Sequence, residues 1–103
     1  LLEQGDTAIF ACNDLMACGV YRYAVEHGIQ IPKNLSVAGF DDAEFSDVLA
    51  VPLTTVRQPS FTLGRAAAER LIAQIRGETV PQEPEVFPPE LKIRASTCPP
   101  KSV

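Results

Sequence analysis

The sequence TAIFAC at residues 7–12 is a continuous apolar run with polar residues on both sides. A run of six residues with a β-branched residue near its centre is typical of a strand buried on both faces, as in a parallel sheet. The polar pair Asn13-Asp14 follows at once, and either side chain can cap the start of a helix. Residues 7–12 therefore predict a buried strand that leads directly into a helix.

The residues that follow complete a strand–helix–strand unit. The pattern over 14–27 is helical and stops at Gly28, the residue type that most often follows the last helical turn. Residues 35–40, LSVAGF, form a second short apolar run of the kind expected for a buried strand. Two strands joined by a helix in this way pair in parallel. The sequence therefore predicts an α/β fold with a parallel open sheet and flanking helices.

The middle of the chain predicts a loop, a short extended piece and a second helix. Residues 41–51 are acidic at first and then mixed, which is typical of a loop or of one short helix. An extended piece is expected over 53–56, and a helix over 60–76 with Ser60 or Thr62 as its cap. The apolar stripe of this helix consists of Leu63, Ala67, Leu71 and Ile75.

The C-terminal part predicts an irregular connection and an edge strand. The prolines between residues 80 and 89 exclude regular structure there. Over 91–96 apolar and polar residues alternate. This alternation predicts a half-buried strand at a sheet edge, with Leu91, Ile93 and Ala95 facing the core.

Composition excludes several classes of protein. The 103 residues are 46% hydrophobic and 21% charged, which argues against intrinsic disorder. The net charge of −4 gives the chain no nucleic-acid-binding surface of its own. No apolar run approaches the roughly 20 residues needed to span a membrane. We expect Cys12, Cys18 and Cys98 to be buried or half-buried free thiols, and their spacing matches no zinc site, so no metal or cofactor is predicted.

The sequence contains no catalytic constellation. Asp41 and Asp42 are adjacent in a segment expected to be extended, so their side chains would point to opposite sides and could not form a facing acid–base pair. His27, the one histidine, closes the first helix, where a solvated position is expected. No serine or cysteine lies in a nucleophile-elbow pattern. We therefore do not expect an enzyme.

Two polar residues each follow a predicted parallel strand. Asn13 and Asp41 lie one residue beyond the runs 7–12 and 35–40, and ligands of open α/β sheets bind beyond the carboxyl ends of the strands. An amide and a carboxylate together suit the hydroxyls of a sugar or the edge of a purine, and Gln58 could reach the same crevice. The alternative is that Asn13 and Asp41 only cap the segments that follow them.

The first predicted helix is apolar on nearly every side, so it needs a second partner besides the sheet. That partner is either a missing part of the chain or a second copy, with Tyr21 and Val25 as candidate contacts, and we expect self-association. The alternative is a helix with harmless exposed apolar side chains.

The number of predicted strands is small for an open α/β sheet. Such sheets usually have five or six strands, so we expect the chain to be the C-terminal piece of a longer protein.

A set of segments then identifies a family to which the chain is similar. The segments are TAIFACNDLMA (7–17), IP (31–32), LSVAGFDD (35–42), PLTTVRQP (52–59), LG (63–64), EL (90–91) and RASTCPP (94–100). Their order resembles the effector-binding domain of lactose/galactose-repressor-type (LacI/GalR) transcription regulators, and the resemblance covers nearly the whole chain.

The resemblance implies a fold like that of periplasmic sugar-binding proteins, in which two subdomains enclose the ligand. Residues 1–58 and 90–98 would belong to the C-terminal subdomain, and the helix within 59–77 would cross to the N-terminal subdomain. The DNA-binding headpiece would lie outside this chain.

The resemblance also implies which residues bind. Family ligand contacts correspond to Asn13, Asp41 and Gln58. The dimer surface of the family corresponds to Cys18, Tyr21, Arg22, Val25, Glu26, Val48, Leu49 and Ala50.

An allosteric function follows from this resemblance. A small effector, a sugar or a purine-like metabolite, would favour one placement of the two subdomains. A homodimer would transmit this change to headpieces on operator DNA. Such a regulator is cytoplasmic and has no membrane partner. The main alternative is an extracytoplasmic sugar-binding protein of an ABC transporter, which has the same fold.

Overall fold

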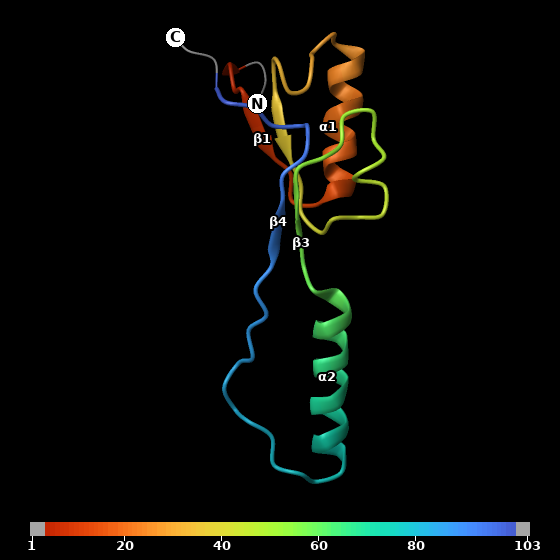
Figure 1. The fold of residues 1–103 in the computed structure, drawn as a ribbon, viewed down its shortest axis with the longest axis vertical. Coiled ribbons are helices and arrows are strands. Elements are labelled where there is room, and N and C mark those ends of the chain that lie inside the picture. Colours follow the sequence, from red (N-terminus) through yellow and green to blue (C-terminus); the bar gives the residue numbers. More distant parts are fainter. Residues whose placement is uncertain (1–3, 101–103) are drawn as a thin grey trace. The chain divides into compact units, whose positions relative to one another are not determined.

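The computed structural model describes residues 4–100, and in it the chain forms two compact units. The first unit contains the residues up to Arg57 and those from Glu90 on, and the second is Gln58–Pro89 (Figure 1). Residues 1–3, which belong to the predicted range 1–58, lie outside the described residues, as do 101–103.

The first unit is built on the predicted strand–helix–strand motif. Strand β1 (Ala8–Phe10) leads into helix α1 (Asp14–Glu26), and strand β2 (Ser36–Ala38) follows. The two strands pair in parallel, with Ile9 opposite Val37, and α1 lies beside them (Figure 1). The predicted α/β fold with a parallel sheet is confirmed.

Helix α1 begins and ends as its sequence indicates. The side-chain oxygen of Asn13 accepts a hydrogen bond from the Met16 N–H at 2.8 Å, which makes Asn13 the N-cap. His27 is the C-cap, and Gly28 adopts a φ of 67°, the left-handed conformation that glycine accepts at a helix end. The helix therefore ends one residue before the predicted limit.

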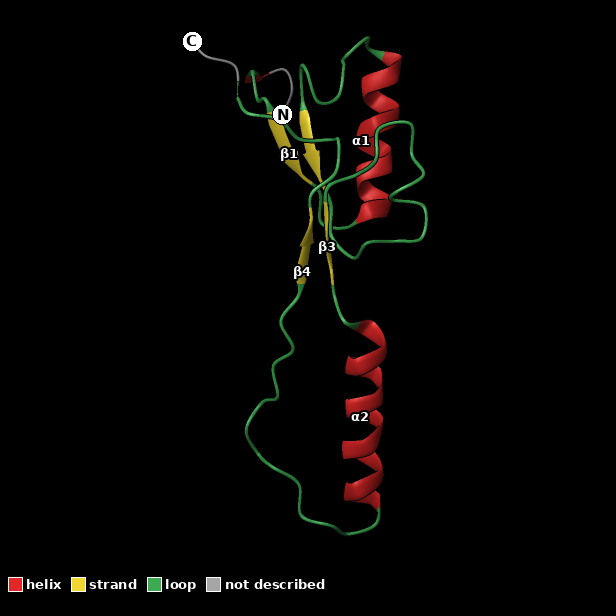
Figure 2. Cartoon of the chain, viewed as in Figure 1, coloured by secondary structure: helices red, strands yellow, loops and turns green. Residues whose placement is uncertain are grey.

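A second pair of strands completes the first unit. Strand β3 (Thr55–Arg57) pairs antiparallel with strand β4 (Glu90–Lys92), and a parallel bridge between Ala38 and Thr54 joins β3 to β2 (Figure 2). Residues 41–51 form turns without a helix. The small core between these elements and α1 contains Ala11, Ala17, Leu35, Val37 and Leu53.

The predicted burial of the first strand on both faces is wrong. Ala8 is exposed, and Phe10 has 69% of its surface exposed, while Ile9 alone of the three β1 residues packs against the core. The reason is that β1 has a strand neighbour on one side only among residues 4–100. Strand β2 has neighbours on both sides, and its Val37 is completely buried.

The alternation over 91–96 is present, but the prediction of its buried side is wrong. Leu91 is 60% exposed and Ile93 is 75% exposed, whereas Ser96 is completely buried. The Ser96 hydroxyl accepts a hydrogen bond from the Thr54 N–H at 2.8 Å and donates one to the Val37 carbonyl. Hydrogen bonds to the neighbouring backbone therefore hold the polar side of this segment inward.

The second unit consists of helix α2 (Ser60–Ile75) and the irregular return over 80–89 (Figure 2). The predicted caps are wrong: Pro59 is the N-cap, and Ser60 lies inside the helix with its hydroxyl donating to the Gln58 carbonyl at 3.4 Å. Four prolines in the return leave its backbone without a regular pattern, as predicted.

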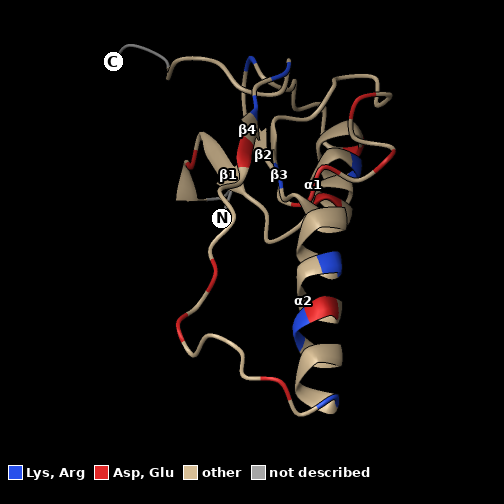
Figure 3. Ribbon diagram, turned by 60° about the horizontal axis from the view of Figure 1, so that its bottom comes forward, with Lys and Arg blue, Asp and Glu red and all other residues tan. Residues whose placement is uncertain are grey.

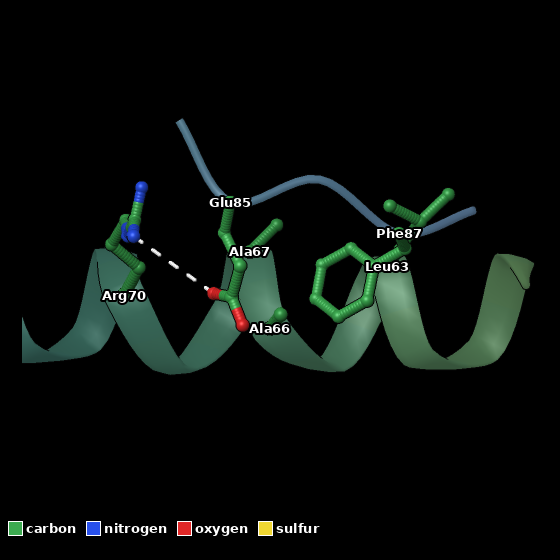
Figure 4. A pocket seen from close by; sticks show the side chains of 6 residues that line it. All are labelled: Leu63, Ala66, Ala67, Arg70, Glu85 and Phe87. Atoms are coloured by element: carbon green, nitrogen blue, oxygen red, sulfur yellow. Dashed lines mark ion pairs between the residues drawn. The ribbon is translucent and has the colours of Figure 1, made fainter. Parts of the chain in front are cut away.

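A shallow groove lies between α2 and the return segment, inside the second unit. Phe87 lies over the helix near Leu63, and Glu85 forms an ion pair with Arg70 at 3.9 Å (Figure 4). Ala66 and Ala67 form the rest of the floor of this groove. Beyond the groove, the predicted apolar stripe is exposed, with Leu71 at 57% and Ile75 at 75%.

The three cysteines are free thiols. Cys18 is half-buried, but Cys12 and Cys98 are exposed, so the expectation that all three are at least partly buried is wrong for these two. Cys12 is exposed because it follows the uncovered strand β1. None of the helices in the described part of the chain is long and apolar enough to cross a membrane.

Candidate functional site

Asn13 and Asp41 lie at the same edge of the first unit. Each comes three residues after a strand, Asn13 after β1 and Asp41 after β2, and the two strands run in parallel. Backbone hydrogen bonds hold this edge: the Asp14 N–H donates to the Phe40 carbonyl at 3.0 Å, and the Asp41 N–H donates to the Val56 carbonyl at 2.9 Å. The structure therefore brings the two predicted residues to the carboxyl ends of adjacent strands.

The two residues present different groups at this edge. The carbonyl oxygen of Asn13 is used in the helix cap, so the –NH2 group is what its side chain offers to a ligand. Asp41 is exposed and has a φ of 111°, a left-handed conformation that is costly for a residue other than glycine. A donor and an acceptor at one edge match the hydroxyl groups of a sugar.

An open hollow of about 480 Å³ lies at the same ends of β1 and β2. Its lining is apolar and comes from the residues just before Asn13 and Asp41, namely Phe10, Ala11, Cys12 and Phe40. Ligand sites commonly combine such an apolar surface with a few polar groups that fix orientation.

Gln58, the third predicted ligand contact, is the first residue of the second unit. Its carbonyl oxygen accepts a hydrogen bond from the Ser60 N–H at 2.8 Å at the start of α2. Asn13 and Asp41 thus share one unit, and Gln58 belongs to the other.

Asp14 is a buried anchor behind this edge that sequence reasoning missed. Only 1% of its surface is exposed, and its carboxylate accepts three hydrogen bonds. The donors are the Thr55 hydroxyl at 2.6 Å, the Ala43 N–H at 2.7 Å and the Ser46 hydroxyl. Asp14 therefore fixes the start of α1 to β3 and to the loop that carries Asp41. Gly39 faces it closely, since a Cβ atom there would overlap the Asp14 carboxylate.

Asp42 is a second enclosed carboxylate, with 3% of its side chain exposed. It forms ion pairs with Arg57 at 2.7 Å and with Arg94 at 2.8 Å. Burial raises the pKa of Asp42, but the hydrogen bonds and charges of Arg94 and Arg57 outweigh this effect and hold the pKa below its ordinary value. Asp42 is therefore ionised at neutral pH.

The expectation that Asp41 and Asp42 lie in an extended segment is wrong. Their φ angles are 111° and 53°, so the chain turns sharply here. Consecutive side chains therefore do not alternate between two faces as they do in a strand. Asp41 is exposed, and Asp42 lies between its two arginines. A doublet of acidic residues directly after a buried strand was the one sequence signal for such a turn, because aspartate tolerates left-handed backbone better than most residues.

The candidate dimer residues divide into exposed and internally packed positions. Val25 is 83% exposed and Val48 is 76% exposed. Tyr21 packs against the core of its own chain, and its hydroxyl donates to the Val51 carbonyl at 2.7 Å, while Leu49 also packs against that core. Arg22 and Glu26 form an exposed ion pair at 3.2 Å, Cys18 is half-buried, and Ala50 is exposed.

Further titratable side chains of the described residues lie exposed and away from this edge. Figure 3 shows acidic and basic positions along α2, where Arg65 and Glu69 form an exposed ion pair at 3.0 Å. His27 is exposed and stacks on Tyr23 with 3.8 Å between the ring centroids. Residues 4–100 contain no group of three or more His, Cys, Asp or Glu side chains suited to a metal ion.

Comparison with known proteins identifies what this arrangement is similar to. The model of the periplasmic binding protein-like domain matches residues 2–97. An HTH-type transcriptional regulator from Streptomyces limosus is 46% identical over 98 residues, which are 95% of this chain and 28% of that protein. The chain thus spans little more than a quarter of the length of this curated relative.

Solved structures agree with this relation. A LacI family transcriptional regulator from Enterococcus faecium with bound ribose has a TM-score of 0.88 and 35% identity, over 97% of this chain and 38% of that one. The lac repressor dimer bound to operator and the anti-inducer ONPF has a TM-score of 0.82 and 35% identity, over 93% and 34% of the two chains. The resemblance to LacI-type regulators inferred from the sequence is confirmed.

Proposed function

Because the chain belongs to the periplasmic binding protein-like domain family, we propose that it is the C-terminal part of the effector-binding domain of a LacI-type transcriptional regulator. In this proposal a small effector binds at the edge formed by Asn13 and Asp41, and Gln58 is a third ligand contact. Effector binding favours one placement of the subdomains and so alters operator binding by the headpieces of a homodimer. The whole regulator acts on DNA, which places it in the cytoplasm.

The observation that carries this proposal is the common position of Asn13 and Asp41. Both follow parallel, adjacent strands by three residues, where α/β sheets bind their ligands. The ribose bound by the Enterococcus faecium regulator supports a sugar as the effector class.

The two units support a division of the protein into subdomains. We assign the first unit to the C-terminal subdomain; it agrees with the predicted range 1–58 and 90–98 except that Gln58 falls in the second unit. The helix within 59–77 belongs to the second unit and is assigned to the N-terminal subdomain. The headpiece is assigned to a segment of the full-length protein outside this chain.

A regulator is favoured over a transport protein and over an enzyme. The matched relative from Streptomyces limosus is an HTH-type transcriptional regulator, and the solved neighbours are regulators as well. The adjacent residues Asp41 and Asp42 also differ in role, because the carboxylate of Asp42 forms ion pairs with two arginines. We therefore propose sensing without catalysis.

A thermal-shift screen of the full-length protein tests this function. The panel consists of D-ribose, D-glucose, D-galactose, maltose, sucrose, cellobiose, adenosine and guanosine. We expect at least one compound to raise the Tm, because a ligand at about 100 times its Kd stabilises the folded state by about 2.7 kcal/mol. The same compound is expected to change operator affinity in fluorescence anisotropy. A panel without any effect on Tm would contradict a sugar or nucleoside effector.

The exposed side of α1 is proposed as a dimer contact, and Val25→Asp tests it. We expect this change to raise the dimer Kd about tenfold or more, because burial of a valine contributes about 1.5–3 kcal/mol and a buried aspartate is costly. Since Val25 is 83% exposed, the fold should be unaffected. Sedimentation equilibrium of the full-length protein measures the Kd.

Val86→Asp is the matched control for this experiment, because Val86 is 82% exposed and lies in the return segment of the second unit. We expect it to dimerise like the wild type. Equal weakening by both substitutions, or none by Val25→Asp, would argue against a dimer contact at α1.

A further inference from the structure

We propose that Asp42 is a positioning residue for effector binding, an inference that rests on the effector site proposed above. Asp42 holds Asp41 at the sheet edge and joins it to β3 and to the segment after β4. Asp42 itself is enclosed, with 3% of its side chain exposed, so it acts through its neighbour and not by touching the effector.

The carboxylate of Asp42 is held from two sides. Arg57 Nε donates to Oδ2 at 2.7 Å, and a terminal guanidinium nitrogen of Arg94 lies 2.8 Å from Oδ1. Arg94 also donates to the Leu53 carbonyl at 3.0 Å, which fixes its guanidinium group. Because each carboxylate oxygen has its own arginine, the side chain has a single orientation.

This orientation stabilises an unusual backbone. Asp41 and Asp42 have φ angles of 111° and 53°, conformations that persist only when the surrounding contacts enforce them. The Asp42 N–H donates to the Thr55 hydroxyl at 3.3 Å, and the Asp41 N–H donates to the Val56 carbonyl at 2.9 Å. Loss of the Asp42 charge would release both arginines, and the backbone at Asp41 would relax toward an ordinary conformation.

The two arginines connect Asp42 to β3 and to the segment that follows β4. Arg57 is the last residue of the first unit before Gln58, and Arg94 follows β4, the strand with which the chain returns to that unit. One carboxylate therefore links the backbone at Asp41 to the last residue of β3 and to the segment after β4.

The test is Asp42→Asn in the full-length protein, which keeps the shape of the side chain and removes its charge. We expect the amides of residues 41–43 to exchange with deuterium about tenfold faster, while the amides of α1 keep their wild-type rates. A merely structural role would accelerate exchange in α1 as well. In isothermal titration with the compounds of the thermal-shift panel, the Kd of any that binds the wild type should rise about tenfold.

Glu69→Gln is the matched control, because it also removes one carboxylate charge from an arginine pair, the exposed Arg65–Glu69 pair of α2. Its exchange rates and Kd should equal those of the wild type. Unchanged exchange at 41–43, equal acceleration in α1, or a Kd within twofold of wild type would overturn the positioning role. If the wild type binds no panel compound, the proposed function fails, and the exchange rates still decide the role of Asp42.

Discussion

Replacement of Asp14 by alanine is expected to lower the free energy of unfolding by about 3–5 kcal/mol. The change removes a carboxylate that is 1% exposed and leaves the buried hydroxyls of Ser46 and Thr55 and the part-buried Ala43 N–H without their acceptor. Each unsatisfied buried donor costs about 1–3 kcal/mol, and hydroxyl groups that rotate to other partners reduce the sum. Urea unfolding of the full-length protein, followed by circular dichroism, measures the effect.

Asp47→Ala is the control for this prediction, since Asp47 lies exposed in the same loop. Its free energy of unfolding should stay within about 0.5 kcal/mol of wild type. Similar stability of the Asp14→Ala and Asp47→Ala proteins would show that Asp14 is not the anchor of this edge.

Removal of the Asp41 side chain is expected to abolish the effector response while the protein stays folded. Glycine is the appropriate replacement, because the φ of 111° at this position would strain an alanine. Loss of a charge-assisted hydrogen bond, and of the orientation it gives, should raise the effector Kd about 100-fold. Operator binding in the absence of effector should be unchanged.

Titration of the Asp41→Gly protein with the compound that shifts the wild-type Tm measures this effect. Glu44→Gly, at another exposed acidic position of the same loop, is the control and should bind like the wild type. An affinity of Asp41→Gly within about threefold of wild type would remove Asp41 from the binding site.

Local sequence signals predicted the elements of this fold well. The helix from Asp14 was correctly placed because Asn13 caps it and Gly28 stops it, and both signals lie within the segment itself. The parallel pairing of β1 with β2 followed from the strand–helix–strand order. The common edge of Asn13 and Asp41 was predictable for the same reason.

Features that depend on distant partners were not predictable. The alternation at 91–96 gave the period of the segment but not its buried side, which depends on the Ser96 hydroxyl accepting from the Thr54 N–H and donating to the Val37 carbonyl. Asp14 looked like one of two possible caps, because its partners Thr55 and Ser46 lie more than 30 residues away along the chain. The turn at Asp42 likewise depends on arginines outside its own segment.

The edge is built twice on the same plan, a more accessible residue followed by an enclosed carboxylate: the half-buried Asn13 before Asp14, and the exposed Asp41 before Asp42. The second member of each pair anchors the surrounding segments, whereas of the first members Asn13 also caps α1 through its side-chain oxygen and Asp41 is exposed. Chemical selectivity can therefore be retuned at Asp41 without loss of an anchor, while a replacement at Asn13 must keep a side-chain oxygen that caps α1. Redesign toward a new small molecule would begin with these leading residues and keep both followers unchanged.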